Sequence, residues 1–228
     1  LAFSRDGKRL LGAGTGGTTA AVLPHLRGRD AEYTFTDVSA LFLTRAGERF
    51  AADDSLRYRL LDVEKDLRSQ GFEHHGYDVI LAANVLHATG ELRPVVRRVR
   101  ELLAPGGMAV LLEGIEHRRW LDLIFGLLDG WWKFRDHDLR PSHPLMGAAA
   151  WEALLKESGF AETAVVQPGQ GLFAQAVILA AAPLEKQASH PQRWLVCSDG
   201  TGVGERLAGL LRGRGDEVTT VVSGERFA

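Results

Sequence analysis

A strand–glycine–helix stretch near the start of the chain constrains the fold more than any other feature. The apolar pair Leu10-Leu11 leads into a glycine cluster, and a run that favours a helix follows it as far as Leu26. Glycine adopts positive φ and lets backbone N–H groups approach a ligand closely, and a helix N-terminus adds unpaired donors. The stretch therefore predicts a nucleotide-type cradle. Two alternatives stay open, because Gly12-x-Gly14-x-x-Gly17 also fits a dinucleotide site, and a glycine turn can bind nothing.

Strands and helices alternate regularly after this stretch, which indicates a doubly wound, mostly parallel α/β sheet. We predict strands at 8–12, 33–36, 57–61, 77–83 and 108–112, separated by helices at 15–26, 39–50 and 92–103. The residues Pro105-Gly106-Gly107 predict a helix stop followed by a turn. After a helix at 151–158, strands at 163–166 and 173–181 are joined by a Pro-Gly turn. These two strands predict an antiparallel hairpin that completes the sheet.

Polar residues stand where the predicted strands end. Asp37, Asp62 and Glu113 follow their strands, and Asn84 and His87 follow the strand 77–83. Ligands of such sheets bind beyond the carboxyl ends of the strands, so we expect these side chains to face one site. For the two aspartates, a role as helix N-cap stays open, because both precede helix-compatible runs.

Composition excludes several classes of function. The chain has 228 residues, 45% of them hydrophobic, and a formal net charge of −2, which gives no reason to expect nucleic acid as a partner. No apolar run reaches membrane-spanning length, and we expect no signal peptide. The single cysteine, Cys197, excludes an internal disulfide framework and cannot form a zinc cluster alone, so we expect no metal site. Because the chain lacks an initiator Met, we expect an excerpt from a longer cytoplasmic polypeptide.

The regular alternation breaks between residues 115 and 150. Aromatic residues crowd this segment, namely Trp120, Phe125, Trp131, Trp132 and Phe134. Two interpretations stay open: an aromatic cap over the end of the sheet, or the wall of a substrate pocket.

A second folding unit is expected near the end of the chain. Residues 183–192 have the composition of a linker. A strand at 193–196, a glycine turn at 198–204, a helix at 205–211 and a strand at 217–222 follow. They predict the opening βαβ of a second Rossmann-like domain, so we divide the chain into domains at 1–182 and 193–228.

Several motifs together resemble the C-methyltransferase domain of modular polyketide synthases. They are Gly-Ala-Gly-Thr-Gly-Gly-Thr-Thr at 12–19, Tyr-Thr-Phe-Thr-Asp-Val-Ser at 33–39 and Ala-Asn-Val-Leu-His-Ala-Thr at 83–89. Leu-Leu-Ala-Pro-Gly-Gly at 102–107, Leu-Leu-Glu-Gly at 111–114 and the aromatic segment at 131–141 extend the resemblance over about residues 8–182. The tail from Arg193 resembles the start of the structural, non-catalytic half of a ketoreductase.

The resemblance implies a class I methyltransferase fold with S-adenosylmethionine as methyl donor. It implies a β-ketoacyl thioester on an acyl carrier protein as acceptor, and the other domains of the same synthase as partners. Gly12, Gly14 and Gly16 would hold the methionine part of the cofactor. Asp37 would bind the ribose hydroxyls and Asp62 the adenine edge, with Asn84 also at the cofactor. His87 and Glu113 would form the catalytic pair, with His87 as general base and Glu113 as the group that orients it.

Two departures from the family pattern keep other functions open. Family members carry an acidic residue two positions before the first glycine, where this chain has Leu10, and their amino-terminal lid region is absent here. A degenerate methyltransferase that serves as a structural spacer is therefore the first alternative. An NAD-dependent oxidoreductase, based on the glycine spacing alone, is the second. Titrations with S-adenosylhomocysteine and with NADPH distinguish the three.

Overall fold

The chain folds into two compact units, which the computed structural model places at Leu1–Leu184 and Glu185–Ala228. The structure describes residues 8–13, 16–167, 174–184, 193–198, 202–213 and 216–222. The predicted turn at 168–171 and Gly14 of the glycine cluster lie outside these residues.

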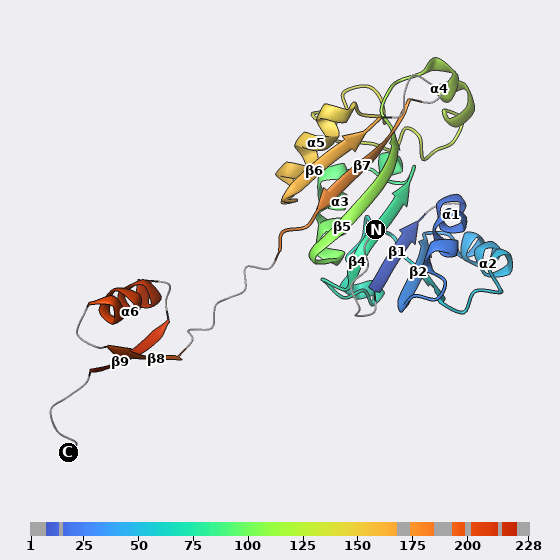
Figure 1. Cartoon of the computed structure of the whole chain (residues 1–228). Helices are drawn as coiled ribbons and strands as arrows, with labels where there is room; N and C mark the ends of the chain where they lie inside the picture. The colour runs from blue at the N-terminus through green and yellow to red at the C-terminus, as the bar shows by residue number, and fades with distance from the viewer. Residues whose placement is uncertain are drawn as a thin grey trace. The chain divides into compact units, whose positions relative to one another are not determined.

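The first unit is built on a seven-stranded sheet with the strand order β3-β2-β1-β4-β5-β7-β6 (Figure 1). Strands β1 to β5 pair in parallel, and β7 pairs antiparallel with both β5 and β6. The predicted doubly wound sheet with an antiparallel end is therefore confirmed. The strands are β1 (Lys8–Ala13), β2 (Ala31–Asp37), β3 (Leu56–Leu60), β4 (Tyr77–Ala83), β5 (Leu103–Gly114), β6 (Glu162–Val166) and β7 (Gln175–Ala181).

Helices cover both faces of this sheet. Helices α1 (Gly17–Leu26) and α2 (Ala40–Arg49) lie on one face, and α3 (Leu92–Leu102) and α5 (Ala148–Glu157) on the other. Because side chains alternate across a strand, neighbours in β1 enter different cores. Leu10 belongs to the core that includes residues of α1 and α2, and Leu11 belongs to the core that includes residues of α3 and α5. The apolar run of the first strand is thus explained by burial on both faces.

Helix α3 illustrates how the sequence pattern positions a helix on the sheet. Its buried residues recur at helical spacing, while arginines occupy the intervening positions. Burial of each large aliphatic side chain stabilises the fold by about 1.5–3 kcal/mol. The buried residues of α3 are Leu92, Val95, Val96, Val99 and Leu102.

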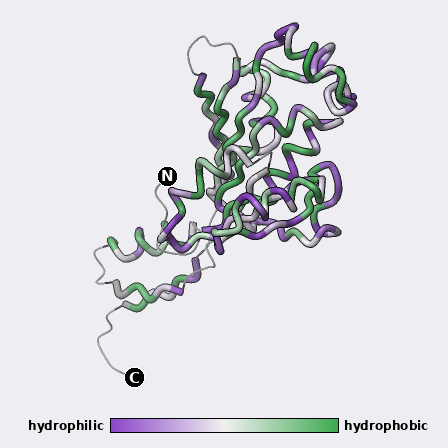
Figure 2. The backbone as a smooth tube through the Cα atoms, turned by 90° about the vertical axis from the view of Figure 1, so that its right-hand side faces the viewer, coloured by the Kyte–Doolittle hydropathy of each residue, from purple (hydrophilic) through white to green (hydrophobic). Residues whose placement is uncertain are grey.

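Hydrophobic and hydrophilic residues are interleaved along most of the chain, as Figure 2 shows. Among the described residues, no helix is long and apolar enough to cross a bilayer.

The prediction of a stop and turn at residues 105–107 is only partly right. Helix α3 ends at Leu102 as expected, but β5 begins at the next residue and includes the Pro-Gly-Gly sequence. Pairing with β4 passes from Tyr77–Leu103 directly to Val79–Met108. The segment therefore forms a bulge within the strand, which glycine permits because Gly106 has a φ of +71°.

The second unit contains β8 (Arg193–Ser198), α6 (Val203–Gly213) and β9 (Glu217–Val222). The two strands pair in parallel, with Arg193 opposite Glu217. The predicted βαβ arrangement is present in this part of the chain.

Candidate active site

A buried histidine–glutamate pair lies at the carboxyl end of the two central strands β4 and β5. Glu113 is the penultimate residue of β5, and His87 lies in the short 3₁₀ turn η2 (Leu86–Ala88) that follows β4. Because β4 and β5 are parallel neighbours, their ends bring the two side chains together. Nδ1 of His87 lies 2.6 Å from Oε2 of Glu113. His87 is 8% exposed and Glu113 is fully buried.

Three donors converge on the Glu113 carboxylate and fix it. Its Oε1 accepts hydrogen bonds from the backbone N–H groups of Val85 at 3.2 Å and Leu86 at 2.9 Å, while Oε2 faces the imidazole. A carboxylate can only accept hydrogen bonds, so the imidazole donates from Nδ1. In the neutral ring, Nε2 then carries the lone pair. The arrangement holds His87 in the tautomer that a general base with a free Nε2 requires.

An asparagine–glutamine pair lies beside this histidine. Asn84 has a φ of +55°, which is uncommon for a non-glycine residue, and its backbone N–H donates to the carbonyl of Leu112 at 2.7 Å. Nε2 of Gln175 donates to Oδ1 of Asn84 at 3.0 Å. The Asn84 side chain therefore presents its amide N–H groups as donors, and β7 fixes their direction.

A cavity of about 310 Å³ opens at these residues. Its polar lining comes from Asn84, His87 and Gln175. Most of the remaining wall is apolar, as in pockets that bind organic ligands. Of the two interpretations of the 115–150 segment, the pocket wall therefore applies to two of its aromatic residues. The apolar side chains that line the cavity include Leu121, Phe125, Leu128, Trp131 and Leu145.

An arginine that the sequence analysis did not single out clamps the histidine turn. Arg140 is 1% exposed, and its guanidinium donates to the backbone carbonyls of His87 at 2.9 Å, Thr89 at 2.9 Å and Gly90 at 3.1 Å. Its Nε donates to Asp136 at 2.6 Å. The signal was present in the Asp-His-Asp-Leu-Arg sequence at 136–140, but only the fold gives it a partner.

The two predicted cofactor aspartates lie at the ends of neighbouring strands. Asp37 ends β2, and its Oδ1 accepts a hydrogen bond from the backbone N–H of Ser39 at 2.8 Å. Asp62 follows β3, accepts from the backbone N–H of Glu64 at 3.0 Å, and pairs with Lys65 at 3.1 Å. The alternative role as helix N-cap is wrong for both aspartates, because Ser39 is the N-cap of α2 and Leu67 that of η1 (Arg68–Gln70), the next helical turn after Asp62. Each aspartate makes a local turn contact instead. Each carboxylate also retains capacity to accept from a ligand hydroxyl.

An apolar cavity of about 110 Å³ adjoins Asp37. The residues that line it include Leu11, Val38, Leu61 and Val63. The Asp37 carboxylate can accept hydrogen bonds from a pair of ribose hydroxyls, and the apolar recess beside it suits an adenine ring. The residues present therefore fit an adenosyl cofactor at this end of the sheet.

The glycine cluster has structural roles in addition to the predicted one. A Cβ at Gly12 would lie 1.8 Å from the hydroxyl of Tyr33, so glycine is required there for packing. Gly16 caps α1 with a φ of +85°, a conformation that favours glycine. The two residues before the cluster, Leu10 and Leu11, are buried apolar side chains. At these positions β1 therefore brings no carboxylate to the site.

Comparison with known proteins agrees with this fold. A family model described as "Methyltransferase domain" matches residues 11–109. The highly reducing polyketide synthase pspA of Penicillium soppii is 38% identical over an alignment of 222 residues, which covers 94% of this chain and 9% of that protein. The CurJ carbon methyltransferase structure is 49% identical with a TM-score of 0.76, covering 80% of this chain and 50% of that one. The chain contains a methyltransferase domain of the kind found in polyketide synthases.

The methyltransferase family and a solved neighbour imply S-adenosylmethionine as the cofactor of this domain. The trans-methyltransferase CalH, solved in complex with SAH, is 40% identical with a TM-score of 0.71 and covers 77% of this chain and 51% of that one. The chain spans under a tenth of the polyketide synthase that it resembles. Because that alignment covers 94% of this chain and the first unit ends at Leu184, the similarity extends into the second unit.

Proposed function

We propose that the methyltransferase domain methylates the α carbon of a β-ketoacyl thioester carried by an acyl carrier protein. The observation that carries this proposal is the buried His87–Glu113 pair at a largely apolar cavity. C-methylation requires a base at an acidic C–H bond, whereas a methyl acceptor that already has a lone pair does not. The carbon between two carbonyls is acidic enough for imidazole to deprotonate.

In this mechanism His87 moves the proton and Glu113 stabilises the product of that step. Nε2 of His87 takes the proton from the α carbon, and the C–H electron pair becomes the enolate nucleophile. The imidazole is then positively charged, and the carboxylate 2.6 Å from Nδ1 stabilises that charge. When bound, S-adenosylmethionine supplies the electrophilic methyl group of its sulfonium centre.

The cofactor would lie over the strand ends next to this pair. We propose that Asp37 binds the ribose hydroxyls, that Asp62 lies at the adenine edge, and that Gly12, Gly14 and Gly16 form the turn near the methionine part. Asn84, between this region and His87, would contribute its amide N–H groups. The apolar cavity beside Asp37 supports this placement.

The acceptor would enter the 310 Å³ cavity, whose apolar side chains suit an acyl chain. An acyl carrier protein and the other domains of a synthase are the partners that we propose. For the second unit we propose the start of a structural ketoreductase subdomain that binds no nicotinamide. NADPH should therefore give no binding heat with this chain.

The test is methyl transfer from isotopically labelled S-adenosylmethionine to a β-ketoacyl carrier protein, with the product located by mass spectrometry. We expect the label on the α carbon, and we expect the rate of its transfer to fall by about 10²–10⁴-fold with His87→Ala. The degenerate spacer is the competing function. It predicts no transfer and no binding of S-adenosylhomocysteine in a calorimetric titration, a result that would refute our proposal.

A further inference from the structure

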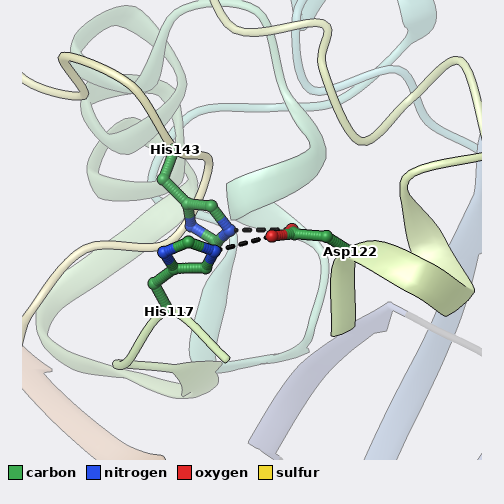
Figure 3. Close-up of side chains that lie close together, drawn as sticks. All are labelled: His117, Asp122 and His143. Carbon is green, nitrogen blue, oxygen red and sulfur yellow. Dashed lines mark hydrogen bonds and ion pairs between the residues drawn. The ribbon is translucent and has the colours of Figure 1, made fainter. Parts of the chain in front are cut away.

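Two histidines and an aspartate meet in the segment between β5 and α5 (Figure 3). His117 precedes α4 (Arg119–Phe125), Asp122 lies on that helix, and His143 lies in the loop before α5. Nε2 of His117 is 2.6 Å from Oδ2 of Asp122, and Nε2 of His143 is 3.0 Å from Oδ1. The two rings lie with centroids 4.1 Å apart, and Figure 3 shows both directed at the carboxylate.

We infer that His117, Asp122 and His143 bind a divalent first-row transition-metal ion. One ligand atom from each residue lies within 4.8 Å of the others. Two imidazole nitrogens and one carboxylate are a donor set that such ions take, with the remaining coordination positions open to water. Metal binding here does not depend on the proposed methyl transfer.

The three ligand side chains have to move apart only slightly to admit an ion. Zinc bonds to nitrogen and oxygen of about 2.0–2.2 Å place neighbouring ligand atoms about 3.3 Å apart around a tetrahedral ion. The nitrogen–oxygen separations of 2.6 and 3.0 Å are a little shorter. The side chain of His117 is 53% exposed, against 10% for His143 and 25% for Asp122. His117 is therefore the ligand that can move outward to admit the ion.

Contacts of neighbouring groups with Asp122 and His143 distinguish metal binding from a triad held by hydrogen bonds alone, because only metal binding changes the tautomer of His143. Trp131 donates from Nε1 to Oδ1 of Asp122 at 3.0 Å, an outer contact that orients a ligand. The backbone N–H of Leu145 donates to Nδ1 of His143 at 3.1 Å, so in the metal-free chain the ring proton is on Nε2. A metal ion at Nε2 moves that proton to Nδ1 and breaks the Leu145 hydrogen bond.

The ion would tie together the two ends of the segment that walls the cavity. His117 and His143 flank Leu121, Phe125 and Leu128, which line it. Metal binding should therefore protect the peptide bonds after Arg118 and Arg119 from trypsin.

The experiment titrates Zn²⁺ into the full chain after removal of metal by a chelator, with calorimetry as the readout. We expect one ion per chain. His117→Ala, at an exposed position, should weaken binding by at least about tenfold, because loss of a residue that only orients a ligand already costs about 10–100-fold. Asp122→Asn, which keeps the shape of the side chain, should do the same. His137→Ala is the matched control, because His137 is an exposed histidine outside the cluster.

Nitrogen NMR of the histidine rings supplies a second readout. We expect zinc to move the His143 proton from Nε2 to Nδ1. Absence of binding, equal affinity for the His117→Ala and His137→Ala variants, or zinc binding without a change of the His143 tautomer would each overturn the inference.

Discussion

Nδ1 of His87 and Oε2 of Glu113 lie 2.6 Å apart, although 25 residues separate the two in the chain, and both side chains are buried. Helix α3 lies between the two residues in sequence and leads the chain back to the sheet, where β5 pairs in parallel with β4. The end of β5 and the turn after β4 therefore meet. The backbone N–H groups of Val85 and Leu86 hold the same carboxylate. The pair is thus a fixed unit of the fold.

Replacement of His87 by alanine should lower methyl transfer by about 10²–10⁴-fold, the usual contribution of a general base. Glu113→Gln should slow the same step by a smaller factor, because the base remains but loses its charged partner. Binding of S-adenosylhomocysteine should be unchanged in both variants. Initial rates and calorimetry measure the two effects, and normal turnover by His87→Ala would contradict the mechanism.

Replacement of Arg140 by alanine should destabilise the domain by about 3–5 kcal/mol, because it leaves Asp136 as a buried charge without its partner. Three backbone carbonyls of the His87 turn also lose their donor. Urea unfolding measures the difference in free energy. Arg97→Ala on the exposed side of α3 is the control, and equal stability of the two variants would contradict the clamp.

Replacement of Asp37 by alanine should weaken binding of S-adenosylhomocysteine by about 1–3 kcal/mol through loss of a charged hydrogen bond to the ribose. Calorimetric titration measures the affinity. Asp54→Ala serves as control, because Asp54 is an exposed aspartate in the turn before β3. If both variants bound as tightly as the unmodified chain, Asp37 would have no role at the ribose.

Replacement of Tyr33 by phenylalanine should change the stability differently at neutral and alkaline pH. At neutral pH it removes the 2.9 Å hydrogen bond to buried Thr19, at a cost of about 1 kcal/mol. Burial raises the pKa of Tyr33, so above about pH 10 the unfolded phenol releases its proton first. The unmodified chain therefore loses stability there as pH rises, and the variant lacks that loss. Urea unfolding at several pH values should show that the difference in unfolding free energy between the unmodified chain and the variant narrows as the pH rises.

The sequence by itself determined the sheet and the edge at which the site lies. Alternation of apolar residues along the strands specifies two buried faces, as Leu10 and Leu11 show by entering opposite cores. Since parallel strands share one carboxyl edge, positions in sequence were enough to bring Asp37, Asn84 and Glu113 to it. The resemblance in the motifs around His87 pointed to the same edge.

Only the tertiary structure decided what segment 115–147 does. Apart from the short helix α4, this segment has no strand or helix period that fixes its path, so packing against the strand ends determines its course. Arg140 reaches the carbonyl of His87 across 53 positions of sequence. His117 and His143 meet at Asp122 for the same reason. The local pattern of apolar residues predicts which face of a helix or strand a side chain occupies. Contacts between irregular segments depend on the whole fold.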